Sequence, residues 1–212
     1  MSKKVSVITV VALLIGTCAP SFAAQAYKKA EKSTESMRKT REEIEKAKVQ
    51  KDKTMAALEQ LVGQSGGDLR KPYKKFADEL KKLDKSSEKV RKIATDMRAK
   101  NQDYFKAWEQ ELSKIQNPDL QKKAGQRRSE AVKKFEEVSP KMQEARDLFV
   151  SFMANLQDIN SYLGTDLSPG GIATISDMVK ETQDQSKAVD DGIAKIMQAL
   201  EEFAAEFSSQ GS

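Results

Sequence analysis

Apolar side chains recur along most of the chain at alternating intervals of three and four residues. In the C-terminal segment this repeat runs from Ile172 to Phe207, and similar repeats run from Leu69 to Ile115 and from Ala131 to Leu163. An α-helix presents such positions on one face, whereas the side chains of a β-strand alternate with a period of two. The pattern therefore predicts long amphipathic helices that pack through apolar seams, as coiled coils do.

Helix-breaking residues separate these repeats. Three glycines lie within residues 63–67, and Asp68 then offers an N-cap for the next helix. Asn117-Pro118 and the glycine-rich segment 164–171 provide the next two interruptions. We therefore expect four long helices, at about residues 27–63, 68–116, 119–163 and 171–207.

The short connections limit how these helices are arranged, because neighbours joined by a few residues must run antiparallel. The expected fold class is all-α, an elongated antiparallel bundle of about four long, coiled-coil-like helices in up-down-up-down order. The composition agrees, since charged residues make up 33% and apolar residues 38% of the chain, with only 5 prolines. An alternative keeps the last three helices together and lets the first project from them.

Two parts of the helical pattern are irregular. In the first helix, polar residues such as Thr34, Arg41 and Lys51 interrupt the apolar seam, so we expect its N-terminal half to be frayed or to face solvent. In the third helix, Pro140 lies within the repeat. Proline lacks a backbone N–H, so we expect it to kink the helix or to split it near Ser139.

The N-terminus has the pattern of a secretory signal peptide. Lys3 and Lys4 precede an uncharged apolar segment, Val5–Gly16, and small residues that suit a signal peptidase follow. We expect residues 1–23 to be removed, with cleavage as late as residue 26, and residues 27–208 to form a single helical domain in the periplasm. The apolar segment is shorter than the ~20 residues that span a bilayer, which disfavours the alternative of a retained membrane anchor.

Cys18, the only cysteine, leaves a second alternative open. It follows an apolar segment, as the lipidated cysteine of a membrane-anchored lipoprotein does. Thr17 argues against lipidation, because the position before such a cysteine is normally Gly, Ala or Ser. We favour a cysteine that is discarded with the signal peptide, which leaves the mature chain without a thiol.

The residues of common catalytic and metal sites are scarce. The chain has no histidine, which excludes Ser-His-Asp relays and histidine-containing zinc sites. Neighbouring carboxylates occur, but successive helical residues point ~100° apart and do not converge on one substrate. We expect no enzyme activity, no catalytic residue, no cofactor and no metal. The carboxylate pairs are Glu42 with Glu43, Glu109 with Glu111, Glu136 with Glu137, Asp190 with Asp191, and Glu201 with Glu202.

Charge is distributed unevenly along the chain. The formal net charge is +5, or +3 without Lys3 and Lys4; residues 68–116 hold fourteen basic and nine acidic side chains, and residues 164–212 hold three and nine. A basic helix surface would suit an anionic membrane or another polyanion. We favour a plainer interpretation, a solvated helix face partly neutralised by the acidic last helix packed alongside. The candidate basic surface consists of Lys71, Lys74, Lys75, Lys81, Lys82, Lys85 and Lys89.

Aromatic residues of the second helix, such as Tyr73, Tyr104 and Trp108, fall on its apolar seam. They would be core there rather than a platform on which bases stack, so we expect no nucleic-acid partner. Two interpretations of Trp108 are open. It is either a buried anchor of the second helix or an aromatic that contacts a ligand near the end of the bundle.

Several short motifs carry a resemblance. They are Gly66-Gly67-Asp68-Leu69 followed by Tyr73, then Trp108-Glu109-Gln110-Glu111-Leu112, and Asn117 to Leu120. In these motifs, and in the order of long charged helices, roughly residues 40–205 resemble a bacterial family of exported proteins described as domain of unknown function 2959. The resemblance implies an envelope location and a helical fold, and it carries over no catalytic residues. Members often look like lipoproteins, a pattern from which Thr17 departs.

Two functional hypotheses follow from these patterns. The first is a non-enzymatic exported scaffold or interaction protein of the bacterial envelope, which binds an unidentified protein partner or associates with itself. The alternative is a peripheral binding module for an anionic membrane surface or another polyanion, which uses the basic second helix.

Overall fold

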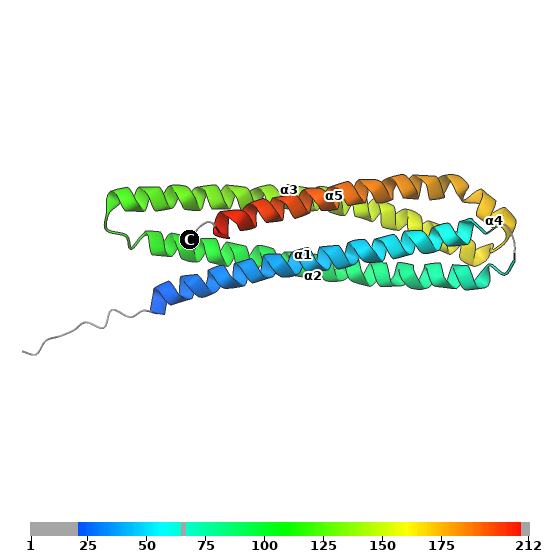
Figure 1. Ribbon diagram of the computed structural model, residues 1–212, viewed down its shortest axis with the longest axis horizontal. Helices are drawn as coiled ribbons and strands as arrows, with labels where there is room; N and C mark the ends of the chain where they lie inside the picture. Colours follow the sequence, from blue (N-terminus) through cyan, green and yellow to red (C-terminus); the bar gives the residue numbers. More distant parts are fainter. Residues whose placement is uncertain (1–20, 65–66, 209–212) are drawn as a thin grey trace, which may run out of the picture.

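Five α-helices form an elongated bundle (Figure 1). The computed structural model describes residues 21–64 and 67–208, with side chains for residues 27–64 and 67–205. Within these ranges every regular element is helical, as the sequence predicts. The elements are α1 (Ser21–Val62), α2 (Arg70–Leu112), α3 (Pro118–Thr165), α4 (Pro169–Thr174) and α5 (Ser176–Ser208). Residues 1–20 of the expected signal peptide, including Cys18, lie outside the described residues.

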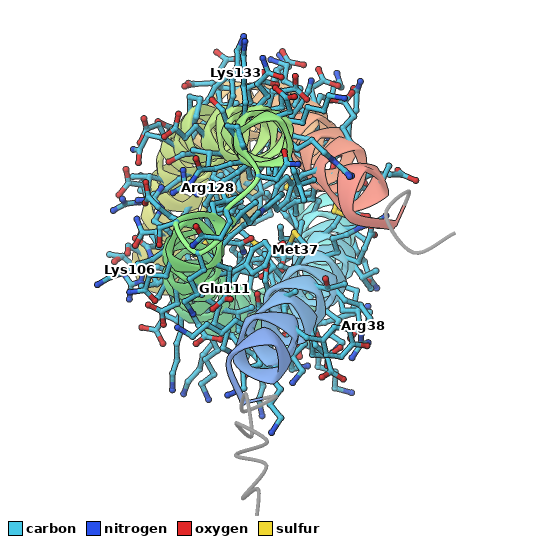
Figure 2. The ribbon with its side chains drawn as sticks, turned by 90° about the vertical axis from the view of Figure 1, so that its left-hand side faces the viewer. Met37, Arg38, Lys106, Glu111, Arg128 and Lys133 are labelled. Carbon is cyan, nitrogen blue, oxygen red and sulfur yellow. The ribbon has the colours of Figure 1, made fainter. Side chains whose placement is uncertain are left out.

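The four long helices form two antiparallel pairs. Helix α1 packs along α2, and α3 packs along α5; the pairs then meet through α2 with α3 and α1 with α5. Seen along the bundle axis, α2 and α5 occupy opposite corners (Figure 2). The antiparallel bundle is confirmed, and the alternative in which the first helix projects is wrong.

Local side-chain contacts explain where the helices begin. The side chain of Asn117 caps α3 by accepting a hydrogen bond from the Leu120 N–H at 3.0 Å, and Pro118 occupies the first turn. The expected N-cap at Asp68 is wrong by one residue, because the N-cap of α2 is Leu69; the Asp68 carboxylate still accepts from the Arg70 N–H at 3.1 Å. The expected helix at 171–207 is wrong as a single element, because the chain turns at Ile175 and divides it into α4 and α5.

The N-terminal half of α1 is packed rather than frayed, which corrects the expectation from its polar seam. Ser33, Met37 and Thr40 are buried. Met37 belongs to the expected seam, but Thr34 of that seam is exposed and its neighbour Ser33 is buried in its place. Small hydroxyl side chains allow this, since Thr40 Oγ1 donates to the Ser36 carbonyl at 2.8 Å and thus satisfies its own polar group.

Helix α3 is continuous through Pro140, so the proline does not split it. The residue is exposed. Solvent therefore reaches the helix surface where the proline leaves a backbone carbonyl without its usual N–H donor, which reduces the cost of the missing hydrogen bond.

The apolar core consists of two clusters, one toward each end of the bundle. The cluster beside α4 includes Leu58, Phe76, Phe152, Leu156, Ile159, Leu163 and Val179. The cluster toward the connection between α2 and α3 includes Met37, Met97, Phe105, Ala131, Val138, Leu200 and Phe203. Figure 2, which looks along the bundle, shows Met37 pointing inward, whereas Arg38, Lys106 and Lys133 point outward.

Candidate functional site

The seven lysines of the candidate basic surface are all exposed on α2, and we call them the α2 lysine face. Lys82 pairs with Glu79 at 2.7 Å and Lys89 pairs with Glu43 at 2.8 Å, while Lys75 donates to Gln60 at 2.8 Å. The other four make no ion pair with any carboxylate that the structure describes; they are Lys71, Lys74, Lys81 and Lys85.

The acidic last helix does not neutralise this face, which corrects our interpretation from the sequence. Helix α5 packs on α3 and α1 and lies diagonally across the bundle from α2 (Figure 2). Its ion pairs to other helices go instead to α1 and α3, as in Lys51 with Asp190 at 2.7 Å and Lys195 with Glu144 at 2.8 Å.

The two helix pairs carry opposite charge. Residues 27–63 and 68–116, which include most of the α1–α2 pair, hold 24 basic and 16 acidic side chains. Residues 117–212, which include the α3–α5 pair, hold 11 basic and 16 acidic side chains. The bundle therefore has one layer with a net charge of +8 and another with a net charge of −5, a separation that the summed charge of +3 conceals.

Lys51 is buried between these layers, with 2% of its surface exposed. Its Nζ donates to Ser186 Oγ at 2.8 Å and to Asp190 Oδ2 at 2.7 Å, and it lies 3.1 Å from Asp52 Oδ1. A buried ammonium group needs such partners because its charge loses the solvation of water. The arrangement joins α1 to α5 and leaves the amine engaged in hydrogen bonds, so it fits a structural role.

Aromatic rings pack together near the connection between α2 and α3. The ring centroids of Tyr104 and Trp108 lie 5.6 Å apart, and those of Phe135 and Phe203 lie 5.3 Å apart. Burial raises the pKa of the Tyr104 hydroxyl to about 12. Trp108 is half-buried, so its packing role is confirmed in part, whereas its contact with a ligand stays a prediction.

Beside these rings, Arg128 joins α3 to α2 (Figure 2). Its guanidinium donates to the Phe105 carbonyl and to Glu109, each at 3.0 Å. Glu109 is one of the paired carboxylates of the sequence analysis, and here it serves as an ion-pair partner. Another, Glu43, binds two lysines, Lys46 and Lys89. Across the described ranges, no group of three or more His, Cys, Asp or Glu side chains is placed to hold a metal ion.

A groove of about 650 Å³ opens between α2 and α3 near the middle of the bundle. Its α2 wall runs from Asp84 to Arg98, and its α3 wall runs from Phe135 to Gln157. Residues of α1 and α5, including Ile44, Lys51 and Ile193, also line it. The groove thus lies between the two core clusters and contacts all four long helices.

The sequence matches the family described as protein of unknown function (DUF2959) over residues 23–209. The chain belongs to this family. No curated protein and no solved structure matches it. Among the described helices of this DUF2959 protein, none is both long enough and apolar enough to cross a membrane.

In this DUF2959 chain, sequence reasoning found the α2 lysine face but missed the groove. A signal was present, because small residues occupy two nearby positions of the second apolar seam, Ser87 and Ala94. Both line the groove, together with Ala47 of α1. Small side chains on facing helices leave space between them unless larger neighbours fill it.

Proposed function

We propose that this DUF2959 protein is a non-enzymatic, exported helical scaffold or interaction protein of the bacterial envelope. The observation that carries the proposal is the division of charge between the two helix pairs of an elongated bundle. Opposite charge on opposite faces steers and orients partner proteins, because a partner with a complementary patch approaches one face and is repelled by the other. The N-terminal pattern of residues 1–23 supports export.

Site-specific photo-crosslinking in living cells tests the interaction. A photoreactive amino acid replaces Lys81 on α2 in one variant and Lys187, an exposed residue of α5, in a matched control. We expect a discrete adduct, to another protein or to a second copy of the chain, that differs between the two positions and is lost when Lys71 and Lys74 are changed to Glu. Identical adducts from both faces, or none from either, would contradict the proposal.

Intact-mass measurement of the protein recovered from the periplasmic fraction tests export. We expect a chain that begins at residue 24 or as late as residue 27. A mass that includes a diacylated Cys18 would support the lipoprotein alternative instead, and a full-length chain in the cytoplasmic fraction would contradict export.

The α2 lysine face favours a second candidate function, peripheral binding to an anionic membrane surface. Lys71, Lys74, Lys81 and Lys85 lie exposed on one helix without an ion pair among the described residues. Each basic side chain near an anionic surface contributes about 1 kcal/mol, and salt weakens the attraction.

Co-sedimentation with vesicles of phosphatidylglycerol and phosphatidylcholine tests this candidate. We expect binding at low salt that is lost at raised salt and in a variant with these four lysines changed to Gln. The control changes four exposed lysines of α3 to Gln, and it carries the same net charge; they are Lys122, Lys123, Lys133 and Lys134. An equal loss of vesicle binding in both variants, or no binding at low salt, would contradict specific binding through the α2 lysine face.

A further inference from the structure

Side-chain contacts join α2 to α3 toward both ends of the groove, one of them beyond its lining residues and the other among them. At one end the Tyr73 hydroxyl donates to the Asn160 carbonyl at 3.2 Å. At the other end the Arg98 guanidinium donates to Ser139 Oγ. The α2 wall spans fifteen residues, from Asp84 to Arg98, and the fourteen steps between them at ~1.5 Å each give a length of ~21 Å.

The interior of the groove is apolar. Buried residues of several helices line it, among them Met97, Val138 and Ile196. Val150 on the α3 wall is 57% exposed and adds apolar surface to the groove. The groove has a volume of about 650 Å³, which lies within the range of small-molecule sites, ~300–1,000 Å³. Such sites are also mostly apolar with a few polar groups.

The mouth of the groove carries three arginines, Arg91 and Arg98 on α2 and Arg146 on α3. All three are exposed, and none pairs with a carboxylate in the part of the chain that the structure describes. Because Arg98 contacts Ser139 and the helices are antiparallel, a step of seven residues along each places Arg91 opposite Arg146. Of the two acidic lining residues, Glu88 lies about one helical turn before Arg91, and Asp84 lies about one turn further along α2.

We propose that this groove binds a long-chain fatty acid, with its acyl chain along the apolar walls and its carboxylate at Arg91 and Arg146. Guanidinium groups bind carboxylates through paired, charge-assisted hydrogen bonds, and the apolar walls remove the acyl chain from water. A carboxylate suits the two arginines better than the apolar face of a helix from another protein, because such a face carries no charge that pairs with them.

Fluorescence titration of the purified protein with dansyl-undecanoic acid, followed by displacement with oleate, tests the site. We expect saturable binding of the probe and its displacement by oleate. Ala94→Trp places an indole in the groove and should weaken binding at least about tenfold, which corresponds to a loss of about 1.4 kcal/mol. Val150→Glu changes an exposed residue, so it keeps the fold while its charge repels the carboxylate and interrupts the apolar wall.

The arginines are tested with two competitors. Arg91→Gln with Arg146→Gln should weaken the affinity for oleate several-fold and leave that for oleyl alcohol nearly unchanged, because the alcohol has no charge to pair; both affinities are calculated from displacement with the affinity of each variant for the acidic probe. Lys92→Gln is the matched control, since Lys92 is exposed on the same helix and does not line the groove. Circular dichroism confirms that each variant is folded.

Several results would overturn the proposal. They are a lack of probe binding, binding that both Ala94→Trp and Val150→Glu leave unchanged, and equal losses for oleate and oleyl alcohol in the arginine variant. A dimer that Ala94→Trp converts to a monomer in light scattering would show that a second copy of the chain covers the groove instead.

Discussion

Several buried polar side chains find a hydrogen-bond partner on another helix or on their own backbone, whereas the buried Oδ1 atoms of Asn160 and Asp190 have none among the described residues. Asn101 is fully buried and accepts a hydrogen bond from Ser33 Oγ at 2.7 Å, while its amide donates to the Met97 carbonyl at 2.9 Å. Thr54 Oγ1 contacts the carbonyls of Gln50 and Glu79. Such pairs favour one register between helices, because a shift along the axis would leave buried polar groups without partners.

Lys51→Met should destabilise the protein by about 1–3 kcal/mol, because Asp190 and Ser186 lose a donor while the methionine keeps most of the packing volume. The double variant Lys51→Met with Asp190→Leu should recover much of this loss, since no unpaired charge remains. The free energy of unfolding in urea, followed by circular dichroism, measures both. Lys187→Met, at an exposed position of α5, is the control. If Lys51→Met lowered the free energy of unfolding no more than this control, a structural role for Lys51 would be contradicted.

Glu43 gives the fold a dependence on pH. The ion pairs with Lys46 and Lys89 hold the pKa of this carboxyl below its ordinary value of 4.5, although its burial acts in the opposite direction. A pKa that is lower in the folded than in the unfolded chain adds to the free energy of unfolding above about pH 4.5, and the contribution is lost as the pH falls through the folded-state pKa.

Glu43→Gln should therefore be less stable than the parent at pH 7, and the difference should shrink as the pH falls below 4.5. Urea unfolding at a series of pH values between neutral and strongly acidic provides the measurement. Glu45→Gln, on an exposed position of the same helix, is the control. A constant difference across the series would show that the charge of Glu43 is not the cause.

At the scale of the elements, α3 and α5 approach each other closely at Gly192. A Cβ atom added there would lie 3.1 Å from the Ala145 Cβ atom and 3.3 Å from its Cα atom. The absence of a side chain therefore lets two long helices pack with little space between them. Gly125 of α3 is different, since a Cβ atom added there meets nothing within 4 Å.

These two glycines form a matched pair for mutation. Gly125→Ala should stabilise the protein by about 0.5–1 kcal/mol, because alanine restricts the unfolded chain and favours the helix. Gly192→Val should destabilise it by about 1–3 kcal/mol through overpacking against Ala145. Thermal and urea unfolding of both variants give the comparison, and stabilisation by Gly192→Val would mean that α3 and α5 are not in close contact there.

The whole molecule is a rod whose length follows from its helices. Helix α3 has 48 residues, which at ~1.5 Å per residue is ~72 Å. Its core is divided into two clusters along this length, with Lys51 and the groove between them. Ile193, which packs against both clusters, joins them through the middle of the bundle.

Small-angle X-ray scattering of the monomer should give a maximum dimension of at least ~70 Å and a radius of gyration well above the ~16 Å of a compact domain of this size. Size-exclusion chromatography with multi-angle scattering establishes the mass to which these values apply. A spherical monomer would contradict the elongated bundle.

The sequence alone predicted the four long helices and most of their ends. The seam through Leu69, Phe76 and Met97 is buried where the repeat of apolar residues predicts it. The breaks at Asn117 and Ser168 cap the helices that follow them. These features could be read from the chain because helical hydrogen bonds and caps join residues only three or four positions apart.

Only the tertiary structure decided the features that depend on residues far apart in the sequence. The repeat does not reveal that α5 lies diagonally from α2, and charge composition alone therefore suggested a neutralised lysine face. Nor does it reveal that Lys51 would be buried against Asp190, or that Ala94 would face a groove. Periodicity identifies which face of a helix is apolar, whereas the choice of neighbouring helix and the space left between side chains depend on the packing of all helices together.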